Sequence, residues 1–279
     1  NTVGGTPLTT LQAFVADRDG HNCYMVSDGI NTAENPTISP LGDLVAYKTY
    51  DGAQTHLWVV NTDPLPANQV RFEIVDPALQ TNGQSMYNGV QSLPTLLYVW
   101  DHMSWDARVD VAANRDQLYY TVNVGGGRTE IHSVQIQRNG SGQPTGLLAG
   151  PSVVETGPVA GRGARSPASF TDLAGANYLF FCGDDTDSYI EFKVNGTGAS
   201  SSAARSVGVR EEAPVPWMDG PTMRLFTVDV ISYAPPRCNI MRLTPPMNGA
   251  AAPDRRRISY DASTSAIVSL YPTYLPPRQ

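Results

Sequence analysis

One residue pattern recurs along the chain of 279 residues. Small or apolar residues lead into a turn rich in Ser, Pro, Asp, Gly and Asn. An apolar segment of strand length follows, and a polar turn separates it from a second apolar segment. The clearest copy has its lead-in and turn at residues 36–43 and its apolar segments at 44–48 and 56–61. Because such a unit cannot bury its own apolar face, neighbouring copies must stack to form a core.

The apolar segments predict strands rather than helices. Residues 190–194 alternate between apolar and polar side chains, and residues 178–181 form an apolar run typical of a strand buried on both faces. No segment keeps a helical period for more than three turns. Second strands of the unit are expected at 11–16, 44–48, 117–122, 177–182, 224–230 and 266–271, third strands at 22–27, 56–61, 130–136, 189–194 and 239–244, and lead-in strands at 107–114, 166–172, 213–220 and 258–261.

Two of these segments resemble a known repeat. Residues 16–26 are similar to the strand–turn–strand of TolB-type repeats, and residues 36–60, with a Ser-Pro-x-Gly turn from Ser39 to Gly42, resemble the next full repeat of that family. The resemblance covers residues 11–61, and weaker copies follow at 106–136, 165–194 and 211–244. It implies an all-β, WD-like β-propeller, mostly of six four-stranded antiparallel blades around a central channel.

The two ends of the chain suit closure of a ring. The chain begins at a second strand without a lead-in and ends with a lead-in and one strand, so the two partial units would pair and hide both sheet edges. We expect a single domain over residues 1–279, with six blades if residues 64–105 hold one and five if they are an insertion. Further insertions are expected at 138–164 and 195–210, and a Pro-rich tail at 271–279.

The composition excludes some partners. A formal net charge of -7 argues against sequence-independent binding to nucleic acid and against docking on anionic lipid. The chain has 25 Gly and 22 Pro residues, which favours many turns, and it lacks an apolar stretch of about 20 residues that could span a membrane. It begins at Asn1 rather than Met, so we expect that an export signal has been removed and that the protein is periplasmic or extracellular.

One short segment concentrates side chains that could carry chemistry. Asp101, His102, Trp105, Asp106 and Arg108 lie just before an expected strand, and lead-in strands line the channel of a propeller. An imidazole, two carboxylates, an indole and a guanidinium at a channel mouth could hold a sugar or a carboxylate ligand. Alternatively, Trp105 packs between blades, and Asp106 forms a structural ion pair with Arg108.

Metal and disulfide signals are weak. Asp184, Asp185 and Asp187 place three carboxylates in one turn, which could bind calcium or be a solvated acidic turn. No motif points to another cofactor. Cys182 and Cys238 could be neighbours in adjacent blades, where they would form a disulfide or remain buried thiols.

These observations favour a non-catalytic propeller outside the cytoplasm that binds a protein or another macromolecule, as an accessory subunit of a surface or periplasmic assembly. Long loops and the absence of a known catalytic motif support this hypothesis. The alternative is a carbohydrate-active lyase or hydrolase with its site at the propeller mouth. The binding candidates are Trp105, Arg108 and Trp217, and the catalytic candidates for an enzyme are Asp101, His102, Asp106 and Arg108.

Overall fold

The computed structural model describes residues 2–3, 6–7, 10–17, 19–50, 55–78, 103–108, 115–125, 128–157, 163–184, 189–196, 201–204, 211–233, 236–245 and 254–258. The elements in these ranges are strands, apart from the short 3₁₀ helix η1 (Pro66–Asn68) and a helical conformation at residues 77–78. No helix in the described part of the chain is long and apolar enough to cross a membrane. The all-β class expected from the repeat is confirmed.

Four four-stranded antiparallel sheets dominate the structure, and each consists of strands that are consecutive in the chain. The sheets are β5 (Thr32–Ile38), β6 (Leu44–Tyr50), β7 (Thr55–Asn61) and β8 (Arg71–Ile74); β9 (Met103–Trp105), β10 (Gln117–Gly125), β11 (Arg128–Arg138) and β12 (Pro144–Glu155); β13 (Gly163–Thr171), β14 (Asn177–Asp184), β15 (Tyr189–Val194) and β16 (Ser201–Ala204); and β17 (Glu211–Asp219), β18 (Thr222–Tyr233), β19 (Pro236–Thr244) and β20 (Asp254–Arg257). Two-stranded sheets are formed by β1 (Thr2–Val3) with β2 (Thr6–Pro7) and by β3 (Phe14–Val15) with β4 (Tyr24–Met25).

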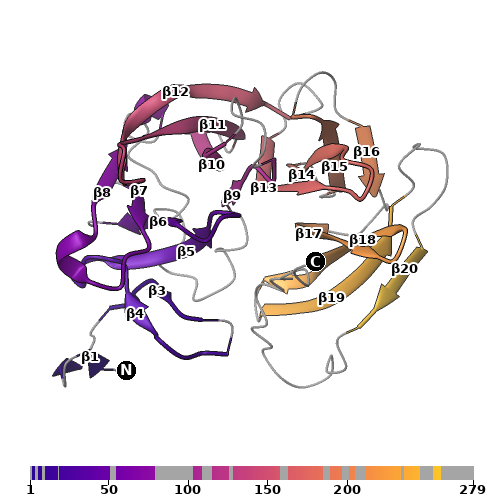
Figure 1. Cartoon of the computed structure of the whole chain (residues 1–279). Coiled ribbons are helices and arrows are strands. Elements are labelled where there is room, and N and C mark those ends of the chain that lie inside the picture. Colours follow the sequence, from indigo (N-terminus) through magenta and orange to yellow (C-terminus); the bar gives the residue numbers. More distant parts are fainter. Residues whose placement is uncertain are drawn as a thin grey trace.

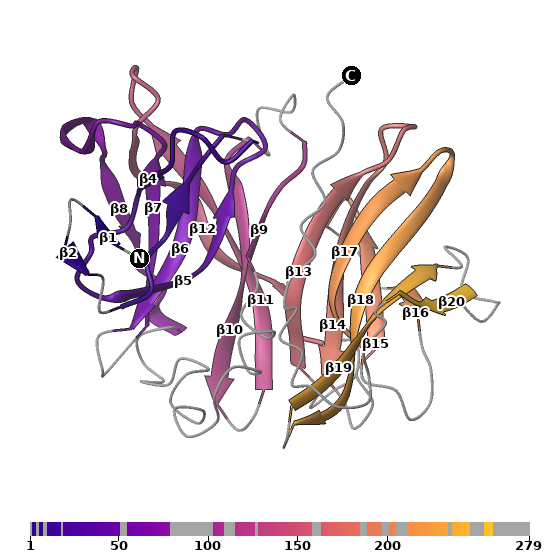
Figure 2. The same cartoon turned by 90° about the horizontal axis from the view of Figure 1, so that it is seen from below.

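The sheets stand around a common centre. Figure 1 shows the first strand of each four-stranded sheet, β5, β9, β13 or β17, nearest to this centre and the fourth strand at the periphery. Seen after a quarter turn, the sheets stand side by side, with their faces toward one another (Figure 2). The inner strands are therefore the elements that can present side chains to a central channel.

Apolar side chains fill the spaces between adjacent sheets. Ala46 and Leu57 of the β5–β8 sheet pack against Leu118 and Tyr120 of the β9–β12 sheet, and all four are buried. Separate clusters lie between the β9–β12 and β13–β16 sheets and between the β13–β16 and β17–β20 sheets, while the β3–β4 sheet packs on the outer side of the β5–β8 sheet. The β5–β8, β9–β12 and β13–β16 sheets thus bury both faces against neighbours, as stacked repeats must.

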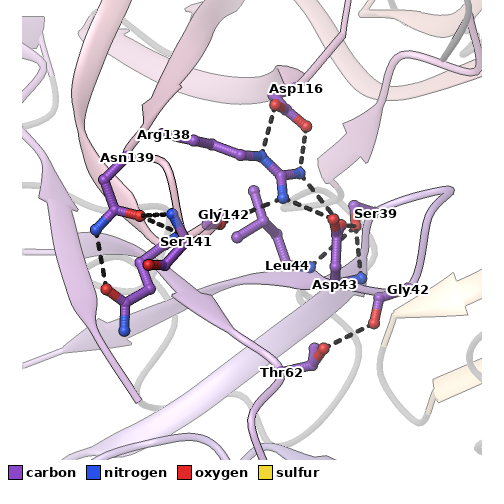
Figure 3. A network of polar contacts seen from close by, with 11 residues as sticks. Ser39, Gly42, Asp43, Leu44, Thr62, Asp116, Arg138, Asn139, Ser141 and Gly142 are labelled. Atoms are coloured by element: carbon purple, nitrogen blue, oxygen red, sulfur yellow. Dashed lines mark hydrogen bonds and ion pairs between the residues drawn. The ribbon is translucent and has the colours of Figure 1, made fainter. Parts of the chain in front are cut away.

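A polar clamp fastens the signature turn of the β5–β8 sheet to the next sheet (Figure 3). The Nε and Nη2 atoms of Arg138 donate to the two carboxylate oxygens of Asp116, and its Nη1 donates to Oδ2 of Asp43 at 2.6 Å. Burial opposes the charge of Arg138, but the hydrogen bonds to Asp116 and Asp43 outweigh it and raise the pKa of the guanidinium. The Ser39 hydroxyl donates to Asp43 and accepts from the backbone N–H of Leu44, which closes the turn.

The expected strands 44–48, 117–122, 177–182 and 224–230 are confirmed as parts of β6, β10, β14 and β18. Three segments expected as insertions instead supply the outermost strand of a sheet: β8 within 64–105, β12 within 138–164 and β16 within 195–210. An outermost strand has one unpaired edge and much exposed surface, so its sequence resembles that of a loop. The strand that pairs with β10 before it in the chain is β9, from Met103 to Trp105, whereas most of the expected lead-in 107–114 lies outside the described residues.

Candidate active site

The same backbone irregularity recurs in three inner strands. In β5, β13 and β17 the pairing with the next strand shifts at a two-residue bulge. A charged residue that is still paired precedes each bulge, and the bulge itself is a non-glycine residue at positive φ followed by proline. The three segments are Glu34–Asn35–Pro36 with φ 49° at Asn35, Arg165–Ser166–Pro167 with φ 54° at Ser166, and Glu212–Ala213–Pro214 with φ 52° at Ala213.

A positive φ at a non-glycine residue costs about 1–3 kcal/mol, and such strain concentrates at functional sites. Bulges are also common beside active sites, because the extra residue changes the direction of a side chain. Proline is tolerated at the bulge since no ladder hydrogen bond is required there. The pairing registers therefore give three inner strands one charged residue each at matching positions, directly before the bulge: Glu34, Arg165 and Glu212. These strands are the ones nearest to the common centre (Figure 1).

Sequence reasoning missed these three residues, although a signal was present. A charged residue stands two positions before Pro36, Pro167 and Pro214. Aligning the lead-in strands on proline rather than on the Ser-Pro-x-Gly turn would have revealed the pattern. The turn signature decays along the chain, whereas the charged-x-Pro triplet is retained in these three sheets.

Lys48 lies beside the first of these charged residues. Glu34 and Lys48 are directly opposite in the pairing of β5 with β6. The Lys48 side chain shares the face of β6 that carries Leu44 and Ala46, which pack against the β9–β12 sheet. Its exposure is 1%, and its Nζ donates to the backbone carbonyl of Thr121 at 3.5 Å. A buried ammonium group thus lies between the inner parts of the two sheets.

Further out in the same interface lies a chain of buried polar groups. Asp76, which follows β8, accepts hydrogen bonds from the Tyr120 hydroxyl at 2.7 Å and from Nδ1 of His132 at 2.8 Å. The second ring nitrogen of His132, Nε2, lies 3.2 Å from Oε2 of Glu130. Asp76 and His132 are almost fully buried. The contacts of both ring nitrogens with carboxylates favour the protonated imidazolium.

The pKa shifts of these hydrogen-bonded groups agree with a protonated His132 ring. Burial opposes ionisation of Asp76, but hydrogen bonds from His132 and Tyr120 outweigh it and lower the pKa of the carboxyl group. Burial also opposes protonation of His132, but the hydrogen bonds and charges of Asp76 and Glu130 raise its pKa. Burial and the nearby charge of Asp76 raise the pKa of Tyr120, which keeps its hydroxyl a neutral donor. Asp76 therefore ties the segment after β8 to the adjacent sheet.

The candidates predicted near β9 take packing and turn positions. Trp105 is buried in the interface with the β5–β8 sheet, and its Nε1 donates to the backbone carbonyl of Thr37 at 3.1 Å. Nε and Nη2 of Arg108 donate to the two oxygens of Asp106 at 2.9 and 2.6 Å. The buried Asp106 carboxylate also accepts from the Tyr119 hydroxyl at 2.8 Å. These contacts match the structural alternative for Trp105, Asp106 and Arg108.

The remaining predicted residues are placed only in part. Trp217 of β17 is half-buried and stacks on Phe226, with ring centroids 3.9 Å apart. The structure does not describe the side chains of several others, which are Asp101, His102, Asp184, Asp185, Asp187 and Cys238. Cys182 is buried in β14, and its pairing with Cys238 stays a prediction. Among the side chains that are described, no group of three or more His, Cys, Asp or Glu residues could hold a metal ion.

Comparison with known proteins identifies the fold. No protein-family model and no curated protein sequence matches the chain. Its structure resembles the putative TolB from Agrobacterium tumefaciens, with a TM-score of 0.50 and 13% identity over 88% of this chain and 79% of that chain. The expected TolB-like β-propeller fold is confirmed.

Similar structures also include enzymes. A structure from a study of two prolyl endopeptidases matches with a TM-score of 0.50 and 14% identity. The match covers 92% of this chain but only 34% of that chain. The endo-arabinase from Bacteroides thetaiotaomicron has a TM-score of 0.48 and 10% identity over 85% of this chain and 84% of that chain. The prediction that favoured a non-catalytic binding propeller is corrected, because this fold is also found in the structure of an enzyme, a prolyl endopeptidase.

Proposed function

We propose that this chain is a polysaccharide-cleaving enzyme whose site lies at the bulges of the inner strands. The observation that carries the proposal is the repeated bulge, which places Glu34 and Glu212 at matching positions in two different sheets and Arg165 in a third. Cleavage of a glycosidic bond by hydrolysis uses two carboxyl groups that flank the bond from different sides. Inner strands of separate sheets around a channel provide such an arrangement.

In this proposal one glutamic acid donates its proton to the leaving glycosidic oxygen as the bond to the anomeric carbon breaks. The other, as carboxylate, takes a proton from the water whose oxygen forms the new bond to that carbon. Asp101 and His102, which come directly before β9 in the sequence, would add to the same mouth. Asp106 and Arg108 are mutually bound, so we assign them to holding the backbone after β9.

Trp217 would contribute to sugar binding. Its indole lies on the inner strand β17 and is held in place by the stacked ring of Phe226 on β18, and aromatic faces of this kind suit the apolar face of a sugar ring. A polysaccharide substrate that does not cross membranes also fits the periplasmic or extracellular location expected from the sequence.

The test is turnover on a panel of neutral polysaccharides and polyuronates with purified full-length protein. Glu34→Gln and Glu212→Gln should each lower turnover by about 100-fold or more, because each removes one proton-transfer group. Glu73→Gln is the matched control, since Glu73 lies on the outer strand β8 and contacts His56. Unsaturated products would indicate elimination, and undiminished turnover in both site variants would refute the assignment.

We also infer that the sheets form a closed ring of five units. Residues 64–105 supply β8 and β9 to two sheets, which favours five units over six. The β3–β4 sheet packs on the β5–β8 sheet as a partial fifth unit, and the apolar segment 266–271 would complete it. In a series of double variants, one cysteine replaces residue 14 and a second cysteine replaces one of residues 266–270. If the ring is closed, a short bifunctional reagent should crosslink the two cysteines in at least one of these variants. Failure of every pair to crosslink would refute the closure.

A further inference from the structure

We infer that Lys48 is a positioning residue that keeps Glu34 ionised and thereby suits Glu34 to act as the base of the proposed reaction. The inference rests on the proposed function for the meaning of this role, but the electrostatic effect of Lys48 on Glu34 can be measured without turnover. It is carried by pairing register, by burial and by the distribution of charge in one interface.

The register places the two charges close together. Glu34 and Lys48 are direct partners of an antiparallel pair, so their Cβ atoms lie about 4.5–5.5 Å apart and their side chains share one face of the sheet. That face is the one toward the β9–β12 sheet, because Leu44 and Ala46 alternate with Lys48 along β6 and pack there. The ammonium and the carboxylate therefore extend into the same space between sheets.

Burial strengthens their interaction. Lys48 is 1% exposed, and its Nζ is oriented toward the backbone carbonyl of Thr121 in β10. Glu34 is half-buried. In such surroundings water screens the attraction between opposite charges poorly, so a nearby cation favours the ionised form of a carboxyl group strongly.

The other charged groups in this interface are engaged with one another. In the described parts of the packed elements, β11 carries Glu130 and His132 toward this interface, and Asp76 follows β8. These three form the hydrogen-bonded chain described above. Of the two arginines of β11, Arg128 contacts Glu130, and Arg138 contacts Asp43 and Asp116. The described residues of β9 and β10 include no charged side chain. Arg165 pairs with Cys182, whose side chain packs in the interface with the β17–β20 sheet, so Arg165 lies on a different face.

The consequence is a defined role for Glu34. A carboxyl group that stays ionised cannot donate a proton, but it can accept one from water. Glu34 beside Lys48 is therefore suited to accept the proton of the attacking water.

The experiment is a ¹³C NMR titration of the glutamate carboxyl groups in the full chain, with the Glu34 signal assigned through Glu34→Gln. In Lys48→Met the Glu34 midpoint should rise by about one pH unit or more relative to wild type, because an opposite charge at this distance lowers a carboxyl pKa by that amount. Lys48→Arg should keep the wild-type midpoint. Lys193→Met is the matched control, since Lys193 is the other lysine and is also buried, at the next interface.

An unchanged Glu34 midpoint in Lys48→Met would overturn the inference. If Lys48→Met does not fold, the wild-type titration decides: a midpoint below about 4.3 supports the inference and one above it refutes it. Where turnover is found, the dependence of kcat/KM on pH gives a second readout. Its acidic limb should move to higher pH in Lys48→Met and keep the wild-type position in Lys193→Met. Absence of turnover on the whole panel would count against the proposed function, while the titration would still test the role of Lys48.

Discussion

Removal of the Arg138 guanidinium should loosen the β9–β12 sheet from the turn of the β5–β8 sheet. The guanidinium contacts both oxygens of Asp116 and both oxygens of Asp43, and its own side chain is 17% exposed. Arg138→Ala leaves two carboxylates facing each other without the cation between them. The effect on stability is the sum of two unequal parts, because the two carboxylates differ in their exposure to water.

The Asp116 side chain is 10% exposed, so its interaction with Arg138 is nearly that of a buried pair. Breaking such a pair by removing one partner costs about 3 kcal/mol or more, because the remaining charge stays buried without compensation. The Asp43 side chain is 43% exposed, and solvent screening reduces its part to about 0.5 kcal/mol. We therefore expect Arg138→Ala to lower the free energy of unfolding by about 3–4 kcal/mol.

The measurement is urea denaturation of wild type, Arg138→Ala, Asp43→Asn and Asp116→Asn, with thermal unfolding as a second readout. At about 2–4 °C for each kcal/mol, Arg138→Ala should lower Tm by roughly 6–16 °C. Arg138→Lys should recover less than half of the loss, since an ammonium cannot bind both oxygens of Asp116 in a fork.

The double variant of Arg138→Ala with Asp116→Asn isolates the pair, and a coupling energy of about 2 kcal/mol is expected. The reasoning fails if Asp43→Asn costs as much as Asp116→Asn, because burial would then not determine the strength of each contact. It also fails if Arg138→Ala costs less than about 1 kcal/mol, the upper value for an exposed ion pair.

Three further predictions concern stability. Folding raises the pKa of His132, so protonated His132 stabilises the fold at low pH, and this contribution is lost as pH rises through the folded pKa of His132. Folding lowers the pKa of Asp76, so ionised Asp76 stabilises the fold at higher pH, and this contribution is lost as pH falls through the folded pKa of Asp76. Both contributions are present between about pH 4 and 6.5, so the difference in free energy of unfolding between wild type and His132→Gln should be largest in that range. Urea denaturation at several pH values measures this difference, and a difference that does not change with pH would contradict the prediction. Gly163→Ala should lower Tm, because the added Cβ would meet the backbone nitrogen of Thr129 at 2.8 Å, and an unchanged Tm would show that the strands separate easily. Ser39→Ala should cost about 1 kcal/mol in urea denaturation through loss of its bonds to the turn, and no cost would mean that water replaces them.

Local pairing explains why the middle strands of each sheet could be predicted from the sequence. The strands β6 and β7 are joined by a short connection and pair along their whole length, so their apolar pattern and the flanking turn residues identify them without distant information. The outermost strands β8, β12 and β16 were not predicted, because an edge strand buries little apolar surface and its residues resemble those of loops.

The candidate site depends on contacts that no local pattern encodes. Lys48 reaches Thr121 across 73 residues of chain, and Asp76 reaches His132 across 56. The sequence by itself determined which residues form the middle strands and which sheet each of them joins, since these follow from alternation and turns between neighbours in the chain. The packing of one sheet against the next decided which charges meet, because the space between sheets is shared by residues whose separation along the chain is unrelated to their distance in the fold.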